Sequence, residues 1–298
     1  SRGLGDVYKR QGSSNCVPIC PVQAKYNANK TMLKALATGN VEIRIRHVAS
    51  TVAIDPKTQE ISGINYKEYA KSKDGQRTVI REGQVQGKVY MLATHAVENA
   101  KILLASNAGN SSGQVGKNLM DHLVMLTWGL APEPIGAFRG PGSTSGVESL
   151  RDGDFRREHS SFRIEIGNWG WNWPETAPLD TATNAIDKLN LFGDELRDYV
   201  KDFVSRQFRI GWELEQLPSE ENYVTIDPEY RDDLGNYRPV IHYDIDDYLA
   251  KGAKVAKGIS DQWFQRVGVQ DYTCLLYTSD AADDMQCVDL GGRRIIKK

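Results

Sequence analysis

The spacing of apolar residues along this chain predicts both helices and strands. Met32, Leu33 and Leu36 mark a helix over residues 27–38 that ends before Gly39, and residues 246–267 have the pattern of a long amphipathic helix. Further helices are predicted at 98–105 and 189–203, and strands at 41–45, 48–55, 61–69, 84–93, 162–167, 208–214 and 223–226. Residues 89–93 are continuously apolar, which is typical of a strand buried on both faces. The mixture predicts an α/β (mixed α+β) fold.

Composition narrows the functional classes. The chain has 298 residues, of which 40% are hydrophobic and 26% are charged, as in an ordinary globular protein. Its formal net charge of -2 gives no overall basic field, so nucleic acid is not an expected partner. The sequence contains no run of about 18 apolar residues, so it predicts no membrane-spanning helix.

Both ends of the chain resemble translated sequencing adapters. Residues 1–11 are similar to one adapter, and residues 274–298 are similar to the partner adapter followed by a flow-cell oligonucleotide. We therefore expect both ends to be foreign and residues 12–273 to be an internal fragment of a longer protein. Cys16 and Cys20 are then the remaining cysteines, and no disulfide framework is predicted.

Cys16 and Cys20 lie four residues apart in the sequence SNCVPICP at residues 14–21. Cysteine thiolates in short loops with a nearby proline hold iron–sulfur clusters, but two cysteines are too few for a cluster. A structural zinc site needs four ligands, and His47 is far along the sequence. Two buried free cysteines explain the pattern equally well, so both interpretations stay open.

A second motif, GKNLMDH, occupies residues 116–122. The glycine turn, with Asn118, Asp121 and His122 after it, could present backbone amides and polar side chains to an anionic cofactor group. The alternative is a turn or helix start with a solvated Asp–His pair. Trp169, Trp171 and Trp173 form a third group, which would line a sugar pocket or pack in a core.

Four blocks together resemble the glucose–methanol–choline (GMC) oxidoreductase family of flavoproteins across essentially all of residues 12–273. They are SNCVPICP with AKY at 24–26, YMLATHAVENAKILL at 90–104, GKNLMDH at 116–122, and EQLP at 215–218 with NYVT at 222–225, Tyr243 and Tyr248. The first block is similar to bacterial membrane-associated sugar and polyol dehydrogenases, whose large subunits carry FAD.

The resemblance implies a domain organisation. It implies a partial, Rossmann-like FAD-binding domain over 12–131 and a substrate-binding domain with an antiparallel sheet over 132–245. Residues 246–273 would begin the return to the FAD and catalytic region. A change in composition supports the first boundary, because residues 132–146 are rich in glycine, proline and serine.

The resemblance also implies roles for particular residues. The backbone of Val48 would lie near the flavin adenine, and Ala93 and Glu98 would flank the dinucleotide. Asn118, Asp121 and His122 would lie near the flavin and its ribityl chain. Cys16 and Cys20 would be the second and third ligands of a 3Fe-4S cluster, which some members of the family carry.

The implied activity is oxidation of a CH–OH group of a sugar or another alcohol by hydride transfer to FAD. A cytochrome c subunit and a small subunit are the implied partners, and the periplasmic face of the inner membrane is the implied location. The family's catalytic histidines would lie outside this sequence, so no catalytic residue is assigned and the chain alone is expected to be inactive and to bind flavin poorly. The alternatives are a non-enzymatic iron–sulfur electron carrier and a cluster-free alcohol oxidase of the same family.

Overall fold

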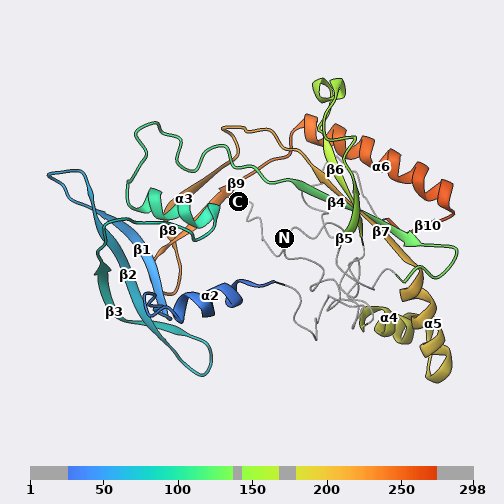
Figure 1. The fold of residues 1–298 in the computed structure, drawn as a ribbon, viewed down its shortest axis with the longest axis horizontal. Coiled ribbons are helices and arrows are strands. Elements are labelled where there is room, and N and C mark those ends of the chain that lie inside the picture. Colours follow the sequence, from blue (N-terminus) through green and yellow to red (C-terminus); the bar gives the residue numbers. More distant parts are fainter. Residues whose placement is uncertain (1–25, 137–142, 168–178, 274–298) are drawn as a thin grey trace. The chain divides into compact units, whose positions relative to one another are not determined.

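The computed structural model describes residues 26–136, 143–167 and 179–273 (Figure 1). The chain forms two compact units. Unit 2 comprises Met32–Met120 and Leu217–Asp244, and unit 1 comprises Asp121–Gln216, the residues before Met32 and those from Ile245 onwards. These boundaries differ from the predicted functional division at 131/132 and 245/246, which stays a prediction. Helix α2 (Ala28–Leu36) confirms the first predicted helix.

Unit 2 is built on a three-stranded antiparallel sheet. Its strands, in the order β1-β2-β3, are β1 (His47–Ile54), β2 (Ile61–Lys71) and β3 (Arg77–Val85). Helix α3 (Ala96–Ala105) packs against β1 and against the hairpin of β8 (Tyr223–Arg231) and β9 (Tyr237–His242). Val52, Ile102 and Ala108 form the small core between helix and sheet. The end of α3 is also tied to β1, because Val52 N donates to Ser106 Oγ at 2.7 Å.

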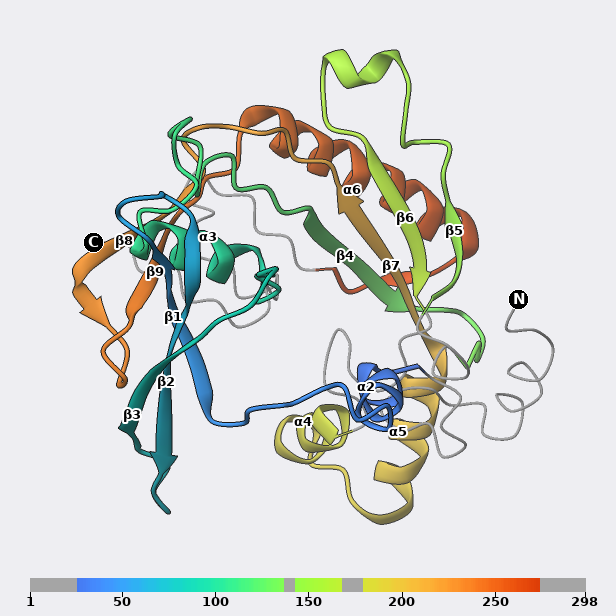
Figure 2. The ribbon, with the colours of Figure 1, turned by 60° about the vertical axis from the view of Figure 1, so that its left-hand side comes forward.

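Unit 1 contains a five-stranded antiparallel sheet, which we call the unit 1 sheet, in the order β10-β4-β7-β6-β5. The strands are β4 (Leu123–Leu130), β5 (Ser143–Val147), β6 (Phe162–Gly167), β7 (Gln207–Leu214) and β10 (Gln270–Asp271). Helix α6 (Asp247–Val267) lies along one face of this sheet (Figure 2). Unit 1 also contains the short helix η1 (Asp154–Arg157), α4 (Leu179–Leu189) and α5 (Gly193–Arg206).

The main core lies between α6 and the unit 1 sheet. Ile210, Trp212 and Leu214 alternate along β7 and are fully buried against the helix. Burial of each such side chain contributes roughly 1.5–3 kcal/mol. The indole Nε1 of Trp212 is not left unpaired, because it donates to Thr127 Oγ1 at 3.0 Å. The strand predicted at 208–214 is confirmed as β7.

The limits of α6 follow from its sequence. Asp246 caps the first turn, because its side chain accepts a hydrogen bond from Leu249 N at 2.8 Å. Gly268 ends the helix with a left-handed φ of 70°. The predicted helix at 246–267 is confirmed, as are the mixed α/β class and the antiparallel sheet.

Two predicted strands are wrong. The strand predicted at 84–93 overlaps β3 only at its first two residues, residues 86–93 form no strand, and Val89 and Met91 are 84% and 85% exposed rather than buried. Residues 41–45 form no strand either, although their apolar residues alternate. A strand requires a hydrogen-bonded neighbour, and neither segment has one within the described part of the chain.

The predicted helix at 189–203 corresponds to α5 (Gly193–Arg206) with its start placed four residues too early, and the separate helix α4 before it was not predicted. Helix α4 ends at Leu189 and α5 begins at Gly193. Asn190 and Gly193 have φ values of 54° and 57°, which a continuous right-handed helix excludes. Asparagine and glycine are the residues that adopt this conformation most readily, so the break is encoded locally.

Candidate cofactor-binding site

Three of the predicted cofactor residues lie on or beside the helix and sheet of unit 2. Val48 lies in β1, opposite Lys67 of β2. Glu98 lies in the first turn of α3, and Ala93 is exposed just before that helix begins. Because α3 packs against β1, these residues come from elements in direct contact.

The start of α3 is shaped by short-range hydrogen bonds. His95 is the N-cap residue, and its Nδ1 accepts from Val97 N at 3.3 Å. Asn99 Oδ1 accepts from Thr94 N at 3.1 Å and from Thr94 Oγ1 at 2.7 Å. Glu98 forms an ion pair with Lys101 one turn later. The start of the helix is thus capped by His95, and the carboxylate of Glu98 beside it suits sugar hydroxyls.

The beginning of the GKNLMDH motif is held against β8 in unit 2. Val224 N donates to Gly116 O at 2.7 Å, and Leu119 N donates to Asn222 O at 2.8 Å. A β-carbon at Gly116 would lie 2.3 Å from Val224 O, so glycine alone allows this approach. Asn118 has a left-handed φ of 56°, and its Nδ2 donates to Gln114 Oε1 at 3.0 Å.

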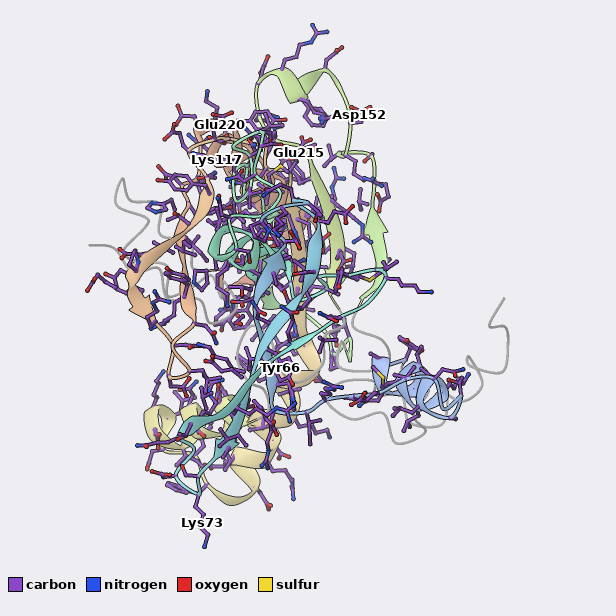
Figure 3. The ribbon with its side chains drawn as sticks, turned by 90° about the vertical axis from the view of Figure 1, so that its left-hand side faces the viewer. Tyr66, Lys73, Lys117, Asp152, Glu215 and Glu220 are labelled. Carbon is purple, nitrogen blue, oxygen red and sulfur yellow. The ribbon has the colours of Figure 1, made fainter. Side chains whose placement is uncertain are left out.

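Lys117 and Glu220 lie side by side at this loop (Figure 3). Lys117 Nζ donates to Glu220 O at 3.3 Å and stands 4.2 Å from the ring centroid of Tyr223. Tyr223 in turn stacks on His242, with ring centroids 4.2 Å apart. This surface stack fixes the side chain of Lys117 against β8 and therefore steadies the loop from the outside.

The end of the motif, Asp121 and His122, belongs to unit 1. The backbone N of Asp121 donates to Gln216 Oε1 at 2.9 Å, and His122 Nδ1 lies 3.4 Å from Asp121 Oδ1. The side chains of His122 and Asp121 are 58% and 56% exposed. The backbone of the pair is therefore fixed, while both side chains are accessible to solvent.

A polar network lies where β7 ends in unit 1, and the sequence alone did not reveal its role. Glu215 Oε2 accepts from Ser161 Oγ at 3.0 Å and from Tyr248 OH at 3.0 Å, and Arg156 forms an ion pair with the same carboxylate. Glu215 and Tyr248 both belong to the fourth sequence block, which was the available signal. The network joins η1, β6, β7 and α6 at one point.

Burial and hydrogen bonding act in opposite directions on Glu215. Burial raises the pKa of this carboxyl group, but the hydrogen bonds from Arg156, Ser161 and Tyr248 outweigh burial and hold the pKa below its usual value. For Tyr248, burial and its hydrogen bond to Glu215 both raise the pKa of the phenol. The network therefore contains a carboxylate and a neutral phenol at neutral pH.

The predicted metal ligands Cys16 and Cys20 lie outside the described residues, and so does the tryptophan group at 169–173. Among the residues that are described, no group of three or more histidine, cysteine or acidic side chains could hold a metal ion. Within the same residues, no helix has the length and apolar character needed to cross a membrane. The iron–sulfur prediction therefore stays untested.

The donor groups fit FAD in kind. Glu98 offers a carboxylate that can accept hydrogen bonds from ribose hydroxyls. Asn118 supplies an amide and His122 an imidazole, the kinds of group that hydrogen-bond the polar edge of a flavin. Each unit thus contributes suitable groups by itself.

Comparison with known proteins gives two matches. Residues 4–124 match the family model described as GMC oxidoreductase, and this range contains all the predicted cofactor residues from Val48 to His122. The chain is also 30% identical over 253 residues to the fructose dehydrogenase large subunit of Gluconobacter japonicus. That similarity covers 83% of this chain, and the chain spans 43% of the length of the relative.

Proposed function

Because the chain belongs to the GMC oxidoreductase family, we propose that it is part of an FAD-dependent enzyme that oxidises a CH–OH group of a sugar or another alcohol. One observation carries this proposal. Val48, Ala93, Glu98, Asn118, Asp121 and His122 were assigned to FAD from sequence motifs, and all of them lie within the matched residues 4–124. Among those in unit 2, Val48 lies in β1, which packs on α3, and Glu98 lies in the first turn of α3.

The roles of the residues follow from their chemistry. Ala93 and Glu98 would flank the dinucleotide of FAD, and the carboxylate of Glu98 would accept hydrogen bonds from ribose hydroxyls. The family resemblance assigns Asn118 to the flavin and its ribityl chain, and it assigns Asp121 and His122 there as well. When bound, FAD would supply the hydride acceptor for oxidation of a carbinol group, and a protein base would take the hydroxyl proton. No described residue is assigned as that base.

The relative supports a sugar as substrate class. It is described as the large subunit of a fructose dehydrogenase, and the similarity extends well beyond the family match into the unit 1 sheet. We therefore propose a sugar or polyol as substrate, and assembly with further subunits, among them a cytochrome c that receives electrons. The chain spans 43% of that relative, so the proposal concerns the larger enzyme.

The test uses the product of the longest reading frame of the source gene that contains this chain. We expect a yellow protein with flavin absorbance, which fructose, glucose, gluconate or sorbitol bleaches under anaerobic conditions. A product that has no flavin absorbance and whose spectrum does not change with any of these sugars would refute the proposal. Iron and sulfide without flavin would instead support a simple electron carrier.

The electron acceptor separates the two enzymatic alternatives. Fast reoxidation of the reduced protein by ferricyanide or a quinone, with slow reoxidation by oxygen, would support a dehydrogenase. Rapid reoxidation by oxygen with formation of hydrogen peroxide would support an alcohol oxidase. Neither result depends on the iron–sulfur cluster, whose presence is measured separately from the iron content.

A further inference from the structure

We propose that Gln216 is a positioning residue that fixes the Asp121–His122 pair for contact with the cofactor. This inference rests on the proposed function, since that function gives the pair its role. It concerns contacts within unit 1 alone. Its starting point is the 2.9 Å hydrogen bond from Asp121 N to Gln216 Oε1, which joins residues 95 positions apart in the sequence.

The register of the unit 1 sheet explains why a side chain is needed at this point. Strands β4 and β7 pair from Leu130 and Gln207 to Leu123 and Leu214. Two residues beyond the last pair, Asp121 would stand opposite Gln216, but the strands have already ended. The amide oxygen of Gln216 therefore replaces the backbone carbonyl that a continued strand would offer to Asp121 N.

Strand β7 ends at Leu214, and four residues later Pro218 has no N–H group with which the ladder of hydrogen bonds could resume. The side chain of Gln216 thus takes the place of a strand backbone group and links the segment after β7 to Asp121 by a hydrogen bond.

Gln216 is itself held firmly. Its residue is 9% exposed, which is unusual for a glutamine. Its neighbour Glu215 is fixed on the β6 side, because Glu215 N donates to Ser161 O at 2.9 Å and the Glu215 carboxylate accepts from Ser161 and Tyr248. The position of Gln216 is therefore set by the polar network before any cofactor binds.

The backbone and the side chains of the Asp121–His122 pair have different roles. The backbone of Asp121 is fixed by a buried amide, while the Asp121 and His122 side chains remain more than half exposed. A buried, preset partner lowers the conformational freedom that a ligand-contacting segment would lose on binding. Loss of the Gln216 acceptor should therefore weaken cofactor contact without removing any group that touches the cofactor.

The first measurement uses the full 298-residue chain and does not depend on flavin. Gln216→Leu removes the acceptor at similar size, and Gln216→Glu keeps an acceptor oxygen. We expect hydrogen–deuterium exchange of the Asp121 amide to become at least tenfold faster in Gln216→Leu and to stay near the wild-type rate in Gln216→Glu. The surface variant Gln265→Leu in α6 is the matched control and should leave this rate unchanged.

The second measurement uses the flavin-containing holoenzyme from the source gene. We expect Gln216→Leu to weaken FAD binding at least fivefold and to shift the flavin absorption band, with both effects rescued in Gln216→Glu. Unchanged amide exchange in Gln216→Leu would overturn the inference, and so would faster exchange with unchanged FAD affinity and spectrum. A wild-type product without flavin refutes the proposed function and the cofactor role of Gln216 together, while the exchange result still reports whether Gln216 holds Asp121.

Discussion

The backbone of Gly116 approaches the carbonyl oxygen of Val224 so closely that a β-carbon on Gly116 would lie 2.3 Å from that oxygen. The two residues also share a hydrogen bond, since Val224 N donates to Gly116 O at 2.7 Å. The φ of Gly116 is 85°, in the region that favours glycine. Steric contact and backbone conformation thus require the same residue.

Gly116→Ala should therefore destabilise unit 2 strongly. The alanine must either accept the left-handed conformation and a clash with backbone, or break the contact with β8. We expect a loss of about 3 kcal/mol in the free energy of unfolding, measured by urea denaturation of the chain. Gly113→Ala is the matched control, because Gly113 has a φ of 70° but nothing within 4 Å of a β-carbon. A loss of only about 1 kcal/mol is expected there.

His95→Gly should stabilise the chain. His95 has φ 91° and ψ 149°, a combination that is largely restricted to glycine. Glycine relieves about 1–3 kcal/mol of backbone strain. Two smaller costs oppose this gain: loss of the side-chain cap costs a few tenths of a kcal/mol, and glycine gives the unfolded chain more conformational freedom. We expect a net gain of about 1 kcal/mol, seen as a higher melting temperature.

His95→Ala distinguishes strain from capping. Alanine keeps a β-carbon in the strained conformation and loses the Nδ1 acceptor for Val97 N. This variant should be less stable than the wild type by about 1 kcal/mol. Equal stability of the glycine and alanine variants would contradict the strain argument.

Local pattern was enough to predict β7 and α6, but β4, whose Met125 belongs to the same core, was not predicted. Residues of β7 and α6 repeat with the period of a strand and of a helix, because one side of each faces the same core. The same reasoning failed at residues 89–93 and 41–45. Apolar content there correctly indicates strand propensity, but pairing depends on a neighbouring strand, which the sequence of the segment does not encode.

The sequence predicted only those residues of the candidate site that belong to a recognisable motif. Gly116 and the Asp121–His122 pair stand out in sequence because they are adjacent and chemically distinctive. Glu215 and Gln216 lie in the EQLP block, but the block alone gave them no role, because their partners lie far away in the chain and are brought close by the register of the unit 1 sheet. Such long-range side-chain contacts follow from the fold and cannot be read from local spacing.

Two glycines of α6 provide a paired test of core packing in unit 1. A β-carbon at Gly252 would lie 1.8 Å from Ser160 Oγ and 3.1 Å from Ser160 O, whereas at Gly258 nothing lies within 4 Å. Gly252→Ala should therefore cost about 2 kcal/mol through overpacking, while Gly258→Ala should gain about 1 kcal/mol from helix propensity. Thermal unfolding of both variants checks the prediction, and similar effects of the two substitutions would contradict it.

Glu215 should make the stability of unit 1 depend on pH. The folded pKa of this carboxyl group lies below its ordinary value of 4.5, because the hydrogen bonds from Arg156, Ser161 and Tyr248 outweigh burial. The unfolded state therefore binds the proton more readily. The stabilising contribution is fully present above the unfolded pKa, and it is lost as the pH falls through the folded pKa.

Glu215→Gln removes this dependence. We expect the wild type to exceed the variant by about 2 kcal/mol in free energy of unfolding at pH 7, the value typical of hydrogen bonds to a charged group, and the difference to shrink steadily below pH 4.5. Urea denaturation at several pH values between neutral and acidic measures it. Tyr248→Phe, which removes one of the donors, should lose about 1 kcal/mol at neutral pH.

The control is Glu158→Gln, which replaces an exposed glutamate outside the network and should follow the wild-type pH profile. A constant difference between Glu215→Gln and wild type at all pH values would show that the carboxylate charge does not stabilise the network.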